Sequence, residues 1–71
     1  LKEFNLALDD LNKAIRLDPN YDVAYFNRGI VKINLLDTAG ALVDWEKATD
    51  LGFDKADNYI RYYSQFYNIQ K

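Results

Sequence analysis

Cysteine, methionine and histidine are all absent from this 71-residue chain, and proline occurs only once. Without cysteine no disulfide can cross-link the fold, and without cysteine and histidine the usual ligand sets for structural zinc cannot be assembled. A single core of this size supplies only about 3 to 5 kcal/mol of stability. We therefore predict a small domain that is held together by packing alone and that binds no metal and no cofactor.

The absence of cysteine is weak evidence for the cellular compartment of the protein. A chain without cysteine suits a reducing compartment without excluding an oxidising one, which leaves the cytoplasm only slightly favoured. No apolar run approaches the roughly 20 residues of a membrane-spanning helix, and the N-terminus lacks the basic and apolar segments of a secretory signal. We expect no membrane insertion. Because the chain does not begin with methionine, we also expect it to be a piece of a longer polypeptide.

Charge is balanced along the chain. Nine basic and eleven acidic side chains give a net charge of −2 and form no block of either sign. Affinity for phosphate rests on clustered lysine and arginine, so we predict no nucleic-acid partner.

The sequence contains few of the side chains that commonly serve in catalysis. With histidine and cysteine absent, the candidate acids and bases are carboxylates, and we interpret them as solvated charges on the polar faces of helices. The sequence has neither a glycine-rich phosphate loop nor the acid spacing of a calcium loop. We predict that the chain is not an enzyme and has no small-molecule substrate. The carboxylates in question are Asp9, Asp10, Asp44, Glu46 and Asp50.

Apolar residues recur three and four apart in several segments, and strand-like alternation is absent. This spacing predicts four helices, over residues 1–17, from 22 to about 35, between Asp37 and Gly52, and over 54–70. Pro19 breaks the first helix, Asp22 and Asp37 are candidate caps, and Gly52 can adopt the left-handed conformation that ends the third. The joints are short, so the fold class should be all-α, with antiparallel helix-turn-helix units.

An internal repeat supports this architecture. Shifting the chain against itself by 34 residues makes nine of 37 pairs identical, where average composition gives about two or three. A period of this length is typical of stacked helical hairpins, whose function is to hold a partner on a surface. The identical pairs are Leu1/Leu35, Ala7/Ala41, Leu8/Leu42, Asp10/Asp44, Lys13/Lys47, Ala14/Ala48, Leu17/Leu51, Tyr25/Tyr59 and Asn34/Asn68.

The repeated residues also follow a known signature. The chain contains Tyr25-x2-Arg28-Gly29-x2-Lys32, Ala41-x3-Trp45-x2-Ala48, and an earlier Ala7-x3-Leu11-x2-Ala14 that is followed by Pro19. In this it resembles the tetratricopeptide-repeat family, with about one and a half repeats and a capping helix. The resemblance makes residues 1–71 one domain. It assigns 1–17 to the second helix of a truncated repeat, 22–51 to a full repeat and 54–70 to the cap.

Several positions depart from the family pattern. Arg28 and Lys32 replace an apolar and an aromatic residue, Leu36 replaces the usual turn glycine, and Phe53 replaces the proline. In the last helix Tyr63 takes the place of a small residue, which would obstruct a further closely packed helix. We therefore expect the array to stop there.

The resemblance implies a groove built from the first helix of each pair. On the second helix an apolar row is displaced from the side that carries Tyr25 and Gly29, so this helix is apolar on two sides. Either a neighbouring helix of the same chain covers both sides, or the second row is an exposed floor that receives a partner segment. Too few polar groups are available for the carboxylate clamp of some family members. The candidate partner-binding residues are Val23, Phe26, Asn27, Ile30, Ile33 and Asn34, with Arg61 at the edge.

A second set of apolar residues could mediate self-association. The first helix begins in mid-repeat, so its apolar stripe lacks part of its cover, and the aromatic residues of the last helix cannot all face inward against Trp45. A homodimer, or contacts from a longer parent chain, would supply that cover. The residues concerned are Phe4, Leu8, Leu11 and Ile15, together with Tyr62, Phe66 and Tyr67.

These observations favour a non-catalytic interaction module that acts as a scaffold or adaptor and binds a protein or peptide partner through an apolar groove. Two alternatives remain open at this point. The chain could serve mainly to assemble subunits, or it could be an accessory domain of a larger enzyme whose catalytic part lies elsewhere.

Overall fold

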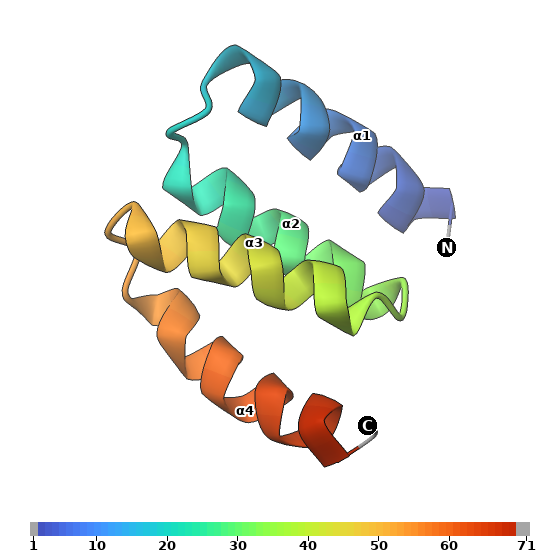
Figure 1. Ribbon diagram of the computed structural model, residues 1–71. Coiled ribbons are helices and arrows are strands. Elements are labelled where there is room, and N and C mark those ends of the chain that lie inside the picture. Colours follow the sequence, from blue (N-terminus) through green and yellow to red (C-terminus); the bar gives the residue numbers. More distant parts are fainter. Residues whose placement is uncertain (1, 70–71) are drawn as a thin grey trace.

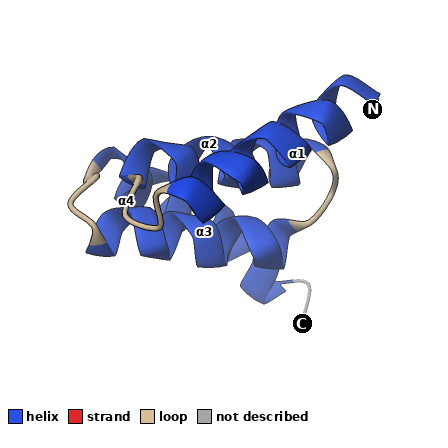
Figure 2. Cartoon of the chain, turned by 90° about the horizontal axis from the view of Figure 1, so that it is seen from above, coloured by secondary structure: helices blue, strands red, loops and turns tan. Residues whose placement is uncertain are grey.

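The computed structural model describes residues 2–69. In that range the chain forms four helices and no strand (Figure 2), which confirms the all-α prediction. Residue 1 of the predicted first helix and residue 70 of the predicted last helix lie outside the described residues. The helices are α1 (Lys2–Leu17), α2 (Asp22–Asn34), α3 (Thr38–Asp50) and α4 (Lys55–Ile69).

The helices pack in chain order as an antiparallel array. α1 lies against α2, α2 against α3, and α3 against α4, with α3 in front of α2 in the view of Figure 1. α2 and α4 therefore flank α3 and run in the same general direction. None of these helices combines the length and the apolar content that crossing a bilayer requires.

Short-range signals set most helix ends. Asp37 caps α3, because its Oδ1 accepts a hydrogen bond of 2.9 Å from the Gly40 N–H, and Gly52 ends α3 with a φ of 104°. The predicted cap at Asp22 is wrong. The N-cap of α2 is Tyr21, which makes no side-chain capping bond. Asp22 is instead the first helical residue, and its carboxylate accepts only from the Val23 N–H.

Leu36, in the turn between α2 and α3, has a φ of 65° and a side chain that is 91% exposed. A left-handed conformation costs a residue with a Cβ about 1 to 2 kcal/mol, and glycine avoids this cost. We expect Leu36→Gly to raise the free energy of unfolding by about 1 kcal/mol in urea titrations, after part of the gain is offset by the greater entropy of the unfolded chain. Leu35→Gly is the control, because Leu35 has a φ of −94° that does not favour glycine. This variant should lower the free energy of unfolding. A less stable Leu36→Gly variant would contradict this account.

Trp45 is the centre of the core. Its side chain is fully buried, as are Ala41, Ala48 and Ala56, and its indole Nε1 donates a hydrogen bond of 3.1 Å to the Phe26 carbonyl oxygen. The small side chains allow the helices to approach the indole closely. The core cluster is built from α2, α3, α4 and the α3–α4 loop, and includes no residue of α1.

Two departures from the repeat pattern contribute to this core. Phe53, at the place of the proline, lies with its ring centroid 4.9 Å from that of Phe26. Tyr63, at the place of a small residue, packs on Trp45 with their ring centroids 5.2 Å apart.

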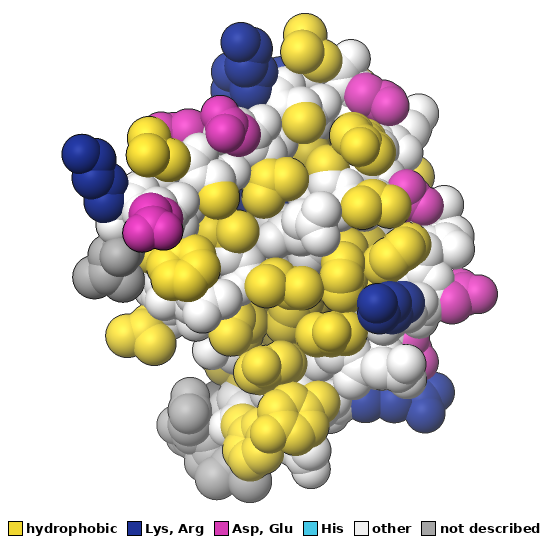
Figure 3. Space-filling view, turned by 180° about the vertical axis from the view of Figure 1, so that it is seen from behind, with side chains coloured by type: hydrophobic (Ala, Val, Ile, Leu, Met, Phe, Trp, Pro, Cys, Tyr) yellow, Lys and Arg dark blue, Asp and Glu magenta, His cyan; other side chains and the backbone are white. Residues whose placement is uncertain are grey.

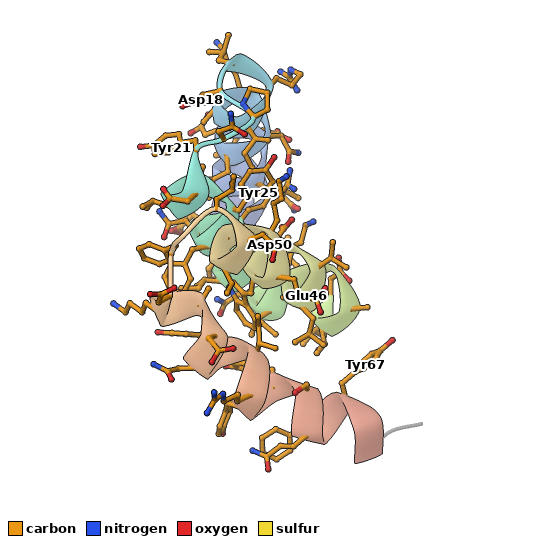
Figure 4. The ribbon with its side chains drawn as sticks, turned by 60° about the vertical axis from the view of Figure 1, so that its left-hand side comes forward. Asp18, Tyr21, Tyr25, Glu46, Asp50 and Tyr67 are labelled. Atoms are coloured by element: carbon orange, nitrogen blue, oxygen red, sulfur yellow. The ribbon has the colours of Figure 1, made fainter. Side chains whose placement is uncertain are left out.

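The turn between α1 and α2 is held by a side-chain hydrogen bond. The Tyr25 hydroxyl donates to the Pro19 carbonyl oxygen at 3.0 Å. Figure 4 shows Tyr25 close to this turn.

Candidate interaction groove

Two neighbouring hollows lie along α2 and α4. The first has a volume of about 250 Å³ and is lined by residues of three helices. The second has a volume of about 230 Å³ and is formed by α4. Both are lined by Tyr59 and Tyr63, so they are parts of one surface, which we call the α2–α4 groove. The first hollow is lined by Ile30, Ile33, Asn34, Trp45, Tyr59 and Tyr63, and the second by Asn58, Tyr59, Tyr62 and Tyr63.

The groove is apolar with a few uncharged polar groups at its margin. Ile30 and Ile33 are half-buried against the core, and none of the residues that line the two hollows carries a charge. Asn34 donates its amide N–H to the Ile30 carbonyl oxygen at 2.9 Å, which orients its side chain. The face of the molecule that Figure 3 shows has a continuous band of hydrophobic side chains over its middle, with charged groups mostly around the margin.

Three of the predicted partner-binding residues, Ile30, Ile33 and Asn34, line the first hollow. Val23 and Asn27 are exposed on α2 without lining either hollow, and the exposed Arg61 is paired with Asp57 at 2.9 Å. The groove residues that the sequence interpretation assigned to no binding surface are Trp45, Asn58, Tyr59 and Tyr63. Aromatic residues at helical spacing in the last helix were the available signal, but they had been interpreted mainly as core.

Phe26 requires a correction. It was predicted to lie on an exposed groove floor, but its side chain is only 6% exposed. The rings of Phe53 and Tyr59 each lie 4.9 Å from it, and the Lys55 ammonium lies 5.9 Å from its ring centroid. For Phe26, the alternative that neighbouring parts of the same chain cover the second apolar side is the correct one. Phe26 therefore packs against Tyr59, which lines the groove, and offers no free surface to a partner.

Asp44 also requires a correction, since it was interpreted as a solvated surface charge and is 2% exposed. Its Oδ1 and Oδ2 accept from Arg28 NH2 and Nε at 2.7 and 2.8 Å, and Oδ2 also lies 3.0 Å from Lys32 Nζ. Arg28 NH1 donates to Asn12 Oδ1 at 3.0 Å. Arg28 and Lys32, the two basic residues that depart from the family pattern, neutralise this buried carboxylate. Together with Asn12 and Asp44 they connect α1, α2 and α3.

The hydrogen bonds that Arg28 makes to Asp44 raise the pKa of its guanidinium above its ordinary value, against the opposing effect of burial. A raised pKa means that the stabilisation is fully present below the ordinary arginine pKa and is lost only when the pH rises through the higher folded value. Arg28 therefore remains a cation throughout the physiological range. Among the described residues no buried side-chain nitrogen or oxygen lacks a hydrogen-bond partner.

Comparison with known proteins places this arrangement in a family. A family model described as TPR repeat matches residues 1–35. RNA polymerase II-associated protein 3 of Xenopus tropicalis is 40% identical over 63 residues, which are 86% of this chain and 10% of that protein. The chain belongs to the tetratricopeptide-repeat family. Of the residues that carry the repeat signature, Ala41, Trp45 and Ala48 belong to the buried core, Tyr25 packs against it, and Gly29 lies against the Trp45 side chain.

Further relatives agree with this assignment. RNA polymerase II-associated protein 3 of Xenopus laevis is 37% identical over 67 residues, 92% of this chain and 10% of that protein. Protein STIP1 homolog of Dictyostelium discoideum is 32% identical over 68 residues, 96% of this chain and 12% of that protein. The tetratricopeptide-repeat chain thus spans about a tenth of the length of these relatives. No solved structure matches it significantly.

The remaining predicted residues of this tetratricopeptide-repeat chain lie at its two ends. The α1 residues of the predicted self-association set are half-buried, and so is Tyr67 on α4. Tyr62 and Phe66 are 54% and 45% exposed, and their ring centroids lie 5.0 Å apart. The α1 residues are Phe4, Leu8, Leu11 and Ile15. The division into a truncated repeat, a full repeat and a cap stays a prediction.

The other carboxylates of the tetratricopeptide-repeat chain are surface groups. Asp9 and Asp10 are exposed on α1. Glu46 and Asp50, which are labelled in Figure 4, are exposed on α3. In the part of the chain that the structure describes, no three metal-liganding side chains gather as a metal site would require.

Proposed function

We propose that this chain is a non-catalytic interaction module that binds a segment of a protein partner in the α2–α4 groove. The observation that carries this proposal is the first hollow, which is lined by Ile30 and Ile33 of α2, by Tyr59 and Tyr63 of α4 and by Trp45 of α3. An apolar groove between two helices is suited to the apolar face of an amphipathic segment. Asn34 and Asn58 would supply hydrogen bonds at its margin.

The size of the groove favours side chains over small molecules. Pockets that hold a cofactor or drug-sized ligand have volumes of about 300 to 1,000 Å³ and enclose most of the ligand. The two hollows, at about 250 and 230 Å³, are smaller and open to the surface. Each could receive one or two apolar side chains of a bound segment, which supports a peptide or protein as the partner.

The relatives support the same kind of role. Two of them are named for their association with RNA polymerase II, which is an association with other proteins. Because this chain spans about a tenth of their length, we extend to it only the binding of a protein partner and not the identity of that partner. A carboxylate clamp remains outside the proposal, since the hollows contain no basic side chain.

The test uses peptides selected from a displayed random library against the folded chain. Ile33→Asp places a charge in the first hollow and should weaken peptide binding by at least about tenfold, because the carboxylate would lose hydration on contact with an apolar side chain. Val43→Asp is the matched control, since Val43 is 63% exposed on α3 and lines neither hollow. Far-ultraviolet circular dichroism checks that both variants fold. The groove assignment would be overturned if both variants lost peptide affinity equally, or if Ile33→Asp kept the affinity of the unmodified chain.

Self-association is a second candidate function, and the exposed rings of Tyr62 and Phe66 favour it. Tyrosine and phenylalanine in contact at a surface are well suited to the centre of an interface. If copies pair through α4, the melting temperature should rise with protein concentration, because mass action links stability to the protomer concentration. Tyr62→Ser combined with Phe66→Ser should remove that dependence. A sedimentation profile that is monomeric at all concentrations would exclude this function.

A further inference from the structure

Arg28, Lys32 and Asp44 form a cluster with a surplus of positive charge where α1, α2 and α3 meet. Arg28 NH2 lies 2.7 Å from one oxygen of Asp44, and Lys32 Nζ lies 3.0 Å from the other. Arg28 also donates from NH1 to Asn12 of α1. Among residues 2–69 no other carboxylate lies within 4.0 Å of either cation. Two cations therefore share one anion, and we call these three residues the cationic cluster.

The second cation is not needed to neutralise Asp44. Arg28 already donates to both carboxylate oxygens, from Nε at 2.8 Å and from NH2 at 2.7 Å, and this two-point pairing is the strong one for a guanidinium. Lys32 adds a like charge close to Arg28. Because the Lys32 side chain is only 22% exposed, water screens the repulsion incompletely. A partly buried charge is costly unless it has a counter-ion of its own.

Both cations keep hydrogen-bond donors that are unused within the described part of the chain. A guanidinium has five N–H groups, and Arg28 directs three of them at Asp44 and Asn12. One N–H on NH1 and one on NH2 remain. An ammonium has three N–H groups, of which the pairing with Asp44 takes one. The Arg28 and Lys32 side chains are 19% and 22% exposed, so a ligand in solution can reach these donors.

The cationic cluster is not a general property of the repeat. At the period of 34 residues the counterparts of Arg28 and Lys32 in α4 are Tyr62 and Phe66, which carry no charge. The family pattern likewise has an apolar and an aromatic residue at these two places. Apolar groups often replace a buried ion network without loss of stability. Packing therefore does not explain why this junction has two cations.

We propose that the cationic cluster binds an oxyanion, which is the carboxylate or phosphate group of a ligand. The anion would accept from Lys32 Nζ and from the remaining N–H groups of Arg28, and charge-assisted hydrogen bonds of this kind are the strong ones. It would also balance the surplus charge, which selects an anion over a neutral ligand. The cluster lines neither hollow of the α2–α4 groove, so this site does not depend on the function proposed above.

The test is a nuclear magnetic resonance titration of the full chain with sodium phosphate, in which sodium chloride holds the ionic strength constant. The Arg28 Nε–H signal should shift and saturate. Lys32→Met removes the surplus charge and should weaken phosphate binding at least about tenfold, the effect of losing one charged hydrogen bond. Lys55→Met is the matched control with the same change of charge, because α4 contributes no residue to the cluster. It should keep the affinity within about twofold.

A second variant and a second ligand complete the test. Lys32→Gln keeps a polar side chain and should lose as much affinity as Lys32→Met, while circular dichroism checks that each variant folds. An acetylated triglutamate peptide, with triglutamine as the neutral control, presents carboxylates in place of phosphate. Tighter binding of triglutamate than of phosphate would assign the site to carboxylates of a protein segment, and the reverse would assign it to phosphate groups. Shifts that never saturate, or equal affinities in the Lys32 variants and Lys55→Met, would overturn the proposal.

Discussion

Replacing Gly29 with alanine is expected to destabilise the fold by about 2 to 3 kcal/mol, although alanine is the better helix former by about 1 kcal/mol. The added Cβ would lie within 2.8 Å of three atoms of the Trp45 side chain, and that side chain is fully buried. The indole cannot move aside without breaking its hydrogen bond to the Phe26 carbonyl oxygen. Urea denaturation followed by circular dichroism measures the loss.

A double-mutant cycle tests the stated cause. Trp45→Leu copies the residue at the equivalent position of α1, Leu11, and leaves room for a Cβ at residue 29. By itself it should cost about 2 kcal/mol through the lost ring contacts and cavity. In combination with Gly29→Ala the total loss should be smaller than the sum of the two single losses by about 1 to 2 kcal/mol. Strict additivity would show that the alanine acts through something other than the indole.

Removing the Asp44 carboxylate should have an effect of similar or larger size. Asp44→Ala leaves Arg28 and Lys32 as like charges without their common partner, and breaking a buried ion pair costs about 3 to 5 kcal/mol. We expect about 3 kcal/mol, at the lower end, because the Arg28 and Lys32 side chains are still 19% and 22% exposed and keep some contact with water. A core of this size supplies only about 3 to 5 kcal/mol in total, so the variant should be largely unfolded at 37 °C, as measured by circular dichroism.

An apolar replacement of the whole network distinguishes the lost pairing from lost packing. Arg28→Leu, Lys32→Tyr and Asp44→Ala together restore the apolar and aromatic residues of the family pattern and remove all three charges. Well-packed apolar groups often replace a buried ion network without loss of stability. The triple variant should therefore recover most of the stability that Asp44→Ala loses. If it is as unstable as the single variant, the aspartate is needed for its shape and not for its charge.

The features that depend on short stretches of chain could be predicted. The ends of the helices followed from Pro19, Asp37 and Gly52, because a break, a cap or a left-handed turn acts on residues within one turn of itself. The signature residues of α3, Ala41, Trp45 and Ala48, are fully buried. Asp22 is the exception, since an acidic residue near a helix start can be the cap or the first helical residue, and the choice depends on one backbone angle.

The errors concern residues whose environment comes from distant parts of the chain. Phe26 was assigned to an exposed floor because its own helix is apolar on two sides, but Phe53 and Tyr59 cover its ring. Asp44 was assigned to the surface because carboxylates seldom lie inside. Its burial requires Arg28 and Lys32, which are 16 and 12 residues away in the chain. The two departures from the family pattern at these basic positions were the only sequence signal of that pairing.

The amino-acid sequence alone determined that this chain forms short antiparallel helices in repeated pairs, because hydrophobic periodicity, caps and breakers act locally and the period of 34 residues is visible in the residues themselves. The tertiary structure decided which apolar and charged residues are covered. Ile30 and Ile33 remain at an open groove while Phe26 is sealed, and Asp44 is paired while its repeat counterpart Asp10 is exposed. The reason is that burial depends on which neighbouring helices are present on each face.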